Sequence, residues 1–274
     1  MDWKRAKLIL IFVFIALNIV LGVVLYRNIK GGEVSQETIK NTRSILEQND
    51  IIVECLIPTY TGKDYILQYQ ETVLDKSKIV GGLLGKDYTK INDNTYEKDT
   101  QRLVFPSNCS FEYSDSGKNN KVFTESKNEV GAKLKELAKK LDIPIGEFQL
   151  DSFNTLVSGE GSRAVYKGVY DGYSVFDNYI EVDIEKSRLK GIKYAYKKPV
   201  NITSRDINVI PVYQILISKI SNYPGIKISD IDMGFKGFNV DKDTKTLYEG
   251  LSWRIKTFSG TEYFFNATNG ESME

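Results

Sequence analysis

The sequence predicts an α+β protein in which antiparallel sheets are each covered by a helix, with one membrane-spanning helix before them. Three observations lead to this prediction. An apolar run occupies residues 8–26, strand-like segments fill most of the remainder, and three segments with helical periodicity lie among those strands. Because each of these helices has one apolar stripe, it can cover one face of a sheet.

The apolar run carries no charge from residue 8 to residue 25, and as a helix it spans about 27 Å, close to the hydrocarbon core of a bilayer. Trp3 and Tyr26 flank it, as interfacial aromatic residues do. No small-residue cleavage pattern follows, so we interpret residues 8–26 as an uncleaved signal anchor rather than a signal peptide.

The orientation of this anchor follows from the basic residues around it. Three precede the run, within residues 1–7, and two follow it closely. Basic residues favour the cytoplasmic side, so we expect a cytoplasmic N-terminus and a cell-membrane protein whose bulk is extracytoplasmic.

Composition excludes several classes of function. Without residues 1–30, which hold five basic and one acidic side chain, the chain has 32 basic and 35 acidic residues, a net charge of −3. No basic field is available to attract nucleic acid. The chain has no histidine, which removes Ser-His-Asp and Cys-His nucleophiles and histidine-bound zinc. These absences remove the common routes to catalysis but do not exclude catalysis itself, and we predict no cofactor or metal ligand.

The two cysteines, Cys55 and Cys109, lie in separate strand-like segments. An extracytoplasmic location permits a disulfide between them. Two buried free thiols are the other interpretation, and spacing alone does not show whether the two side chains are close.

The chain after the anchor divides into a linker (27–34), an N-terminal α+β lobe (35–118), a larger C-terminal α+β lobe (119–270) and a tail (271–274). Helices are expected at 36–48 with Ser35 as N-cap, from the capping box Ser126–Glu129 up to Pro144, and at 208–221 with Pro211 in the first turn. Strands are expected at 51–57, 65–74, 103–105, 110–113, 148–157, 163–170, 173–184, 189–196, 226–235, 247–257 and 261–265.

Two connections carry strong turn signals, Asp171-Gly172 and Ser259-Gly260, and both predict hairpins. Residues 86–100 are charged and are expected to form a loop. Gly81, Gly82 and Gly85 lack the lysine and hydroxyl residue of a phosphate-binding loop, so we interpret them as a turn or a strand bend.

Two further patterns have a functional and a structural interpretation. Oxygen ligands alternate from Asn239 to Asp243, but Thr244 and Gly250 replace the glycine and glutamate that a calcium loop needs, so we favour a solvated hairpin connection.

The carboxylate pairs Asp230/Asp232 and Glu181/Asp183 each share one face of a strand, as an acid/base pair for sugar hydrolysis requires. We favour a structural interpretation instead, in which these carboxylates lie on the solvent-exposed face of a sheet. The aromatic cluster of Trp253, Tyr263, Phe264 and Phe265 is interpreted as core and edge packing.

Within the anchor, Asn18 and Gly22 lie four residues apart and so share one helix face, flanked by Phe14 and Leu25. In lipid an amide gains about 0.6–2 kcal/mol from a hydrogen bond to another helix, and a glycine permits close approach. A single tolerated polar residue without a partner is the alternative interpretation.

The residues 1–7, Met-Asp-Trp-Lys-Arg-Ala-Lys, and the apolar run with Leu17-Asn18 and Leu21-Gly22 resemble the opening of the YycI (WalI) regulatory proteins of Gram-positive bacteria. Residues 251–254 and 263–271 are similar to the closing hairpin of that family. Positions that carry the resemblance are Trp3, Asn18 and Gly22 in the anchor and Trp253, Arg254 and Asn266 in the hairpin. The two cysteines depart from the family, and the middle of the chain matches by layout alone.

The resemblance implies a non-enzymatic accessory protein of a two-component system. Such a protein contacts the YycG (WalK) sensor histidine kinase through its transmembrane helix, acts together with YycH, and tunes cell-wall metabolism signalling. It implies a fold like parts of YycH, with PepSY-like units, and neither catalytic residues nor a cofactor. Two alternatives remain: an anchored wall hydrolase that uses two carboxylates, and a PepSY-like binding or inhibitory module for a secreted protease or wall ligand.

Overall fold

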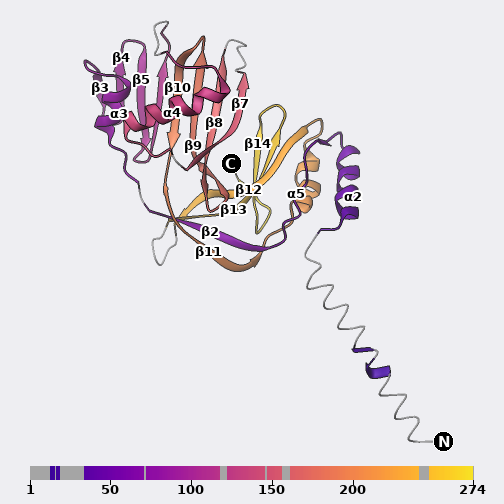
Figure 1. Ribbon diagram of the computed structural model, residues 1–274. Coiled ribbons are helices and arrows are strands. Elements are labelled where there is room, and N and C mark those ends of the chain that lie inside the picture. Colours follow the sequence, from indigo (N-terminus) through magenta and orange to yellow (C-terminus); the bar gives the residue numbers. More distant parts are fainter. Residues whose placement is uncertain are drawn as a thin grey trace, which may run out of the picture. The chain divides into compact units, whose positions relative to one another are not determined.

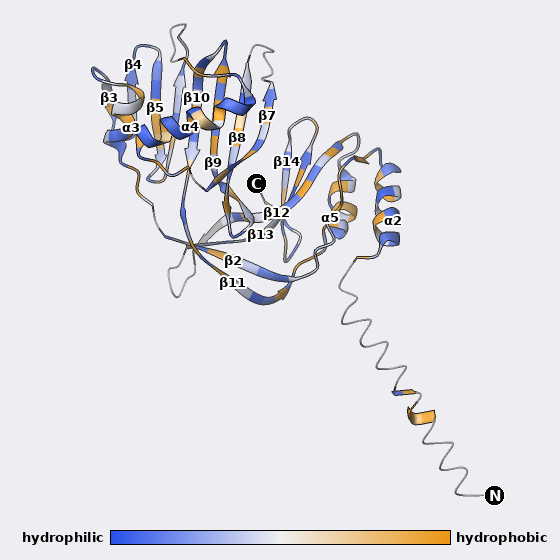
Figure 2. Ribbon diagram, viewed as in Figure 1, coloured by the Kyte–Doolittle hydropathy of each residue, from blue (hydrophilic) through white to orange (hydrophobic). Residues whose placement is uncertain are grey.

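The computed structural model describes residues 13–15, 17–18, 34–70, 72–117, 122–145, 147–155, 161–240 and 247–273, which form helices and a mostly antiparallel set of strands (Figure 1). The predicted β-rich α+β class is confirmed for this part of the chain. No helix within it is long and apolar enough to cross a membrane. The predicted anchor, 8–26, falls almost entirely outside it; residues 13–15, which it does include, are helical and apolar (Figure 2).

The chain folds into two compact units that are discontinuous in sequence. Unit 1 takes Met1–Asp64, Asp206–Asp232 and Trp253–Glu274, and unit 2 takes Tyr65–Arg205 and Met233–Ser252. This division differs from the consecutive lobes expected at 35–118 and 119–270. The reason is strand pairing between distant segments, which local sequence patterns do not reveal.

Four strands contain a boundary between the units: β2 (Lys63–Gln70), β11 (Lys198–Asn208), β12 (Lys227–Val240) and β13 (Leu247–Thr257). Unit 1 adds α2 (Gln36–Glu47), β1 (Ile52–Val53), α5 (Val212–Ser218), the 3-10 turn η1 (Ile220–Asn222), β14 (Glu262–Asn266) and β15 (Ser272–Met273). Its strands follow the order β1-β12-β13-β14-β15, with β1 parallel to β12, and α2 lies beside α5 (Figure 1).

The helices of unit 1 begin where the sequence supplies their first hydrogen bonds. The Ser35 hydroxyl accepts from the Thr38 amide at 3.1 Å, which confirms the predicted cap of α2. The third predicted helix starts later than expected, at Val212 after Pro211. The amides of Val209 and Ile210 instead donate to Gly62 and Ala267 carbonyls, which keeps the chain extended up to the proline.

Unit 2 contains α3 (Lys76–Leu83), β3 (Thr89–Asn92), β4 (Thr95–Lys98), β5 (Gln101–Ser107), β6 (Ser110–Asp115), α4 (Lys127–Leu141), β7 (Phe148–Thr155), β8 (Ser162–Tyr170), β9 (Tyr173–Glu185) and β10 (Arg188–Ala195). Its strands follow the order β2-β13-β12-β9-β10-β6-β5-β4-β3, and β8 and β7 extend the sheet from β9. The parallel pair in this unit is β9 with β12; the other pairs with a defined register are antiparallel.

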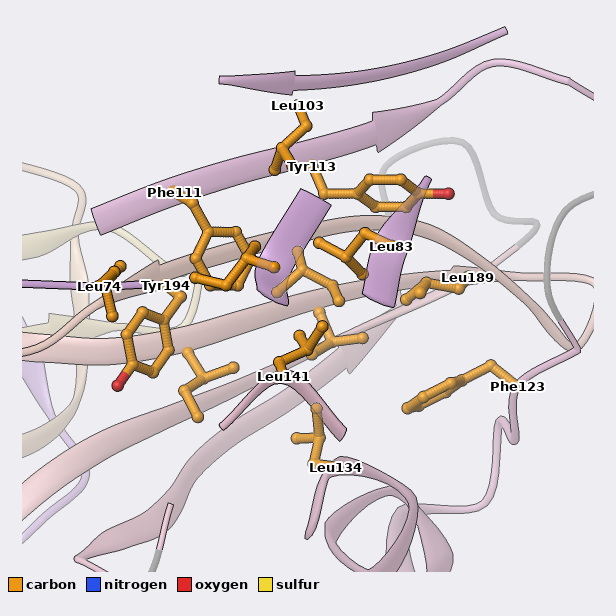
Figure 3. Close-up of a cluster of buried hydrophobic side chains, with 14 of the residues drawn as sticks. Leu74, Leu83, Leu103, Phe111, Tyr113, Phe123, Leu134, Leu141, Leu189 and Tyr194 are labelled. Atoms are coloured by element: carbon orange, nitrogen blue, oxygen red, sulfur yellow. The ribbon is translucent and has the colours of Figure 1, made fainter. Parts of the chain in front are cut away.

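Helices α3 and α4 lie on one face of the unit 2 sheet (Figure 1). The hydrophobic side chains between these helices and the sheet form the core (Figure 3). On β9 the core residues are Ile180, Val182 and Ile184, which are at most 2% exposed. The residues between them in sequence, including Glu181 and Asp183, are half-buried and therefore belong to the opposite face. The face predicted to be shared by Glu181 and Asp183 is confirmed, and so is the Asp171-Gly172 hairpin, where both residues have positive φ.

Two expectations for unit 2 are wrong. Gly81 and Gly82 lie inside α3 rather than in a turn or bend. A Cβ at Gly82 would come within 2.4 Å of the Leu141 side chain of α4, so the glycine allows the two helices to approach closely. Residues 86–100 contain the strands β3 and β4 rather than only a loop. The charged residues there do not prevent strand formation, because β3 is the exposed edge strand of the sheet and β4 lies beside it.

Candidate functional site

The closing hairpin is the first candidate from the sequence, and it consists of β13 and β14. Trp253 is 1% exposed, and its indole nitrogen donates to the Ile210 carbonyl at 2.8 Å, just before α5. A buried indole needs such an acceptor, and here the bond fixes the segment that leads into the helix. Trp253 therefore serves the packing of unit 1.

Arg254, the next residue, is 2% exposed and forms ion pairs with two carboxylates. Its guanidinium donates to both carboxylate oxygens of Asp232, at 2.8 and 2.6 Å, and to Glu262 at 3.1 Å. The Nζ atom of Lys256 lies 3.7 Å from the same Glu262 carboxylate. This planar fork is the strong geometry for an arginine–carboxylate pair. The ion cluster joins β12, β13 and β14, and it engages Asp232, one member of the carboxylate pair with Asp230.

Asn266 ends β14 and closes the turn that follows. Its side-chain oxygen accepts from the amide and the hydroxyl of Thr268, at 2.8 and 2.7 Å, and from the Asn269 amide at 3.3 Å. Asparagine forms such turns because its short side chain reaches the backbone two residues on. The three hairpin residues of the resemblance thus stabilise the fold of unit 1.

The anchor residues are described only in part. Trp3, Gly22 and Leu25 lie outside the described residues, and Phe14 and Asn18 lie within a short helical piece. The Asn18 side chain donates to the Phe14 carbonyl at 2.9 Å, one turn earlier. A carboxamide has two N–H donors and an oxygen that can accept two hydrogen bonds, so this bond uses one of its four hydrogen-bonding positions.

The remaining candidates from the sequence are placed as follows. Cys55, in unit 1, and Cys109, in unit 2, are both free thiols, and burial raises the pKa of Cys55. Part of the calcium-like segment, residues 241–246, falls outside the described residues. No group of three or more histidine, cysteine, aspartate or glutamate side chains is arranged to hold a metal ion in the part of the chain that the structure describes.

A buried carboxyl group lies in unit 2, and no sequence pattern indicated it. Glu249 on β13 is fully buried, accepts a short hydrogen bond from the Tyr69 hydroxyl, and lies 3.1 Å from the Lys197 Nζ atom. Burial, and next the nearby charge of Asp177, raise the pKa of the Glu249 carboxyl. Burial also raises the pKa of Tyr69, so its hydroxyl stays a hydrogen-bond donor.

A further group of charges lies on the sheet face of unit 2 opposite α3 and α4. Glu112 of β6, Lys193 of β10 and Glu181 of β9 are consecutive partners in the strand register. Two residues further along each strand, Ser114, Gly191 and Asp183 form the next row. A hollow of about 300 Å³ opens over these rows.

One arginine lines this hollow, and a second one binds a carboxylate in its lining. The Arg163 guanidinium of β8 donates to both oxygens of Asp183, at 2.6 and 2.8 Å. Arg102 of β5 lines the opposite side and lies 3.3 Å from Glu97 of β4. The sequence identified Glu181 and Asp183 from their alternation. It missed Arg102, Glu112, Lys193 and Gly191. These residues also lie on the exposed face of their own strands, but only the strand order shows that they are neighbours.

Comparison with known proteins identifies the family of this chain. The crystal structure of YycH from Bacillus subtilis aligns with a TM-score of 0.49 and 14% sequence identity, over 76% of this chain and 53% of that one, so this chain spans about half of the YycH length. No curated protein matches. The sequence model of the YycI protein family matches residues 29–268, which is most of the chain and covers all of unit 2 and most of unit 1. The chain therefore belongs to the YycI family, the regulatory proteins of two-component systems that its opening and its closing hairpin resemble.

Proposed function

We propose that this protein is a membrane-anchored, extracytoplasmic accessory regulator of a sensor histidine kinase of the YycG (WalK) type. It acts with a YycH-like protein and tunes signalling for cell-wall metabolism. The observation that carries the proposal is the family match over residues 29–268, joined in sequence to the charge-free run at 8–26. The protein performs no catalysis in this role and needs no cofactor.

Regulation in this proposal is a shift between two signalling states of the kinase. A bound partner shifts such an equilibrium only through its different affinity for the two states. The anchor supplies one contact, in which the Asn18 amide bonds across to a kinase helix and Gly22 permits close approach. The bond from Asn18 to Phe14 leaves one N–H and the oxygen of the amide for that purpose.

The test replaces Asn18 and Gly22 with leucine in the full-length chain and measures kinase output with a promoter reporter. Loss of one interhelical amide bond, about 0.6–2 kcal/mol, corresponds to a change of about 3- to 30-fold in the occupancy of the complex. Val20→Leu is the matched control, since residue 20 lies about 200° around the helix from residue 18.

Expression and membrane insertion are measured in parallel, so that a lost anchor is not mistaken for a lost contact. Unchanged output from Asn18→Leu and Gly22→Leu removes the transmembrane contact from the proposal. Unchanged output from deletion of the whole gene overturns the regulatory role itself.

Topology has its own test, because the only two cysteines, Cys55 and Cys109, both follow the anchor. Both side chains are partly exposed. A membrane-impermeant maleimide added to intact protoplasts should label them, and a Cys55→Ser, Cys109→Ser chain is the control. Labelling that requires cell lysis contradicts the extracytoplasmic placement.

The second candidate, a PepSY-like binding module for a secreted protease or a wall ligand, is favoured by one observation, the hollow on the unit 2 sheet. The two candidates differ in a simple way. Binding of such a ligand by a chain whose deletion leaves kinase output unchanged supports the module and contradicts the regulator.

A further inference from the structure

The buried carboxyl group of Glu249 connects three segments of unit 2. The Tyr69 hydroxyl of β2 donates to one of its oxygens, and the Lys197 Nζ atom donates to the other at 3.1 Å. In the strand register Glu249 of β13 lies opposite Leu67 of β2, so Tyr69 is its diagonal neighbour. Lys197 belongs to the connection between β10 and β11. One fully buried side chain thus joins β13 to two other segments.

Lys197 is held by its backbone and, separately, by its side chain. The buried Asn178 of β9 accepts from the Lys197 amide and donates to the Lys197 carbonyl, both at 2.8 Å. The Lys197 side chain passes the Tyr69 ring, with Nζ 5.6 Å from the ring centroid, and is 21% exposed. Its ammonium group can therefore turn to solvent while its backbone stays in place.

The ionisation of Glu249 decides whether the bound position of Lys197 is favourable. An ionised carboxylate balances the charge of the ammonium group. Beside a neutral carboxylic acid the same group loses this counter-charge while it remains largely out of water, which is costly. Lysine has a flexible four-carbon stem and a strongly hydrated ammonium group, so it can move into water instead.

The groups around Glu249 set the pH at which it takes up a proton. Burial is the largest cause that raises the pKa of Glu249, and the charge of Asp177 on β9 is the next. That carboxylate is bound to the Lys236 Nζ atom of β12 at 2.9 Å. The charge of Lys197 and the hydrogen bond from Tyr69 act in the opposite direction, because both favour the carboxylate. The net result is a pKa above the ordinary value of 4.5.

We propose that Glu249 and Lys197 form a proton-operated latch in unit 2. The ionised carboxylate holds the Lys197 ammonium group against β13 and β2, and uptake of one proton from solvent by Glu249 releases that group to water. Lys197 keeps its own proton, so the chain gains one positive charge. The latch goes beyond the proposed regulatory function, because it needs no kinase. Its response to acid outside the cell rests on the extracytoplasmic location proposed above.

The test is reductive dimethylation of the full-length chain in detergent micelles, with formaldehyde and a borane reductant, between about pH 5 and pH 9. Peptide mass spectrometry gives the labelling rate of Lys197 in Glu249→Gln and in the parent chain, and their ratio cancels the pH dependence of the reagent. The ratio should be about 5 at the upper end, which corresponds to ~1 kcal/mol for a partly exposed ion pair, and about 1 at the lower end.

Lys133 on α4 is the internal control in the same spectra. Its partner Glu136 lies outside the latch, and the two side chains are 54% and 74% exposed. Lys133 should label at the same rate in both chains at every pH. The melting temperature shows whether Glu249→Gln has folded. If it has not, the parent chain carries the test, because its Lys197 labelling relative to Lys133 should rise as pH falls.

Two further variants should move the midpoint of this pH-dependent change in opposite directions. Tyr69→Phe keeps the ring but removes the hydroxyl that donates to the carboxylate, so the midpoint should shift to higher pH. Asp177→Asn removes the neighbouring negative charge, so the midpoint should shift to lower pH. A purely structural role for these side chains predicts no opposite shifts.

Two outcomes overturn the inference. One is Lys197 labelling, relative to Lys133, that stays constant over the whole pH range. The other is a midpoint that Tyr69→Phe and Asp177→Asn leave unchanged or shift in the same direction. Because the labelling uses the purified chain alone, its failure leaves the kinase reporter results unaffected, and an unchanged kinase output leaves the latch unaffected.

Discussion

The closing hairpin of unit 1 and the open sheet face of unit 2 both collect charged side chains on neighbouring strands, but they use them differently. In the hairpin, Arg254 is 2% exposed and is bound to Asp232 and Glu262. On the open face, Arg102 is 59% exposed and lies at the border of a hollow. A buried cluster fixes strand order, whereas an exposed one keeps its charges accessible to a ligand.

The largest expected effect concerns the two arginines. Arg254→Met removes a buried guanidinium and leaves the half-buried carboxylates of Asp232 and Glu262 without their main cation, so it should lower the free energy of unfolding by about 3 kcal/mol. Arg102→Met should cost less than about 1 kcal/mol, because its ion pair is exposed. Urea unfolding followed by circular dichroism measures both. Equal losses for the two variants would break the comparison.

The second prediction compares two glycines of unit 2, one under the helices and one on the open face. Gly82→Ala should destabilise the protein by about 1–3 kcal/mol, since its Cβ would meet the buried Leu141 side chain at 2.4 Å. Gly191→Ala has room for its methyl group and should stabilise the strand by up to about 1 kcal/mol. Gly81→Ala, within the same helix as Gly82 but with no atom within 4 Å, is the control. Thermal melting of the three variants should give one decrease and two small increases.

The smallest effect is a pH dependence with opposite signs for a buried and an exposed carboxylate. The raised pKa of Glu249 means that the folded chain binds this proton more tightly than the unfolded chain, so stability falls as pH rises above the ordinary value of 4.5. Glu249→Gln should remove that fall and therefore gain stability relative to the parent chain as pH increases. Unfolding midpoints measured from pH 4 to pH 8 would show it.

The exposed carboxylate is Asp93, whose pKa is lowered by its hydrogen bond with Lys90. Its contribution is present above the ordinary pKa and is lost as pH falls through the lowered value. The Asp93→Asn variant should therefore be slightly less stable than the parent chain at neutral pH, and the two stabilities should become equal in acid. Parallel behaviour of the Asp93 and Glu249 variants would contradict the assignment of buried and exposed roles.

Much of the fold follows from local sequence. Ser35 marks the start of α2, Asp171-Gly172 forms its hairpin, and the alternation in β9 separates a covered face from an exposed one. These features depend on neighbouring residues, through capping, turn geometry and the two-residue period of a strand. The glycines of α3 misled the prediction, since an isolated segment does not show that α4 lies against Gly82.

The sequence by itself determined the secondary structure of most strands, the lack of histidine chemistry and the family to which the chain belongs. Tertiary structure alone decided that distant segments share each unit, that Arg254 is buried among carboxylates, and that Arg102, Gly191 and Asp183 line one hollow. The physical reason is that periodicity assigns a side chain to a face of its own strand, while strand order and register decide which side chains from other strands lie beside it.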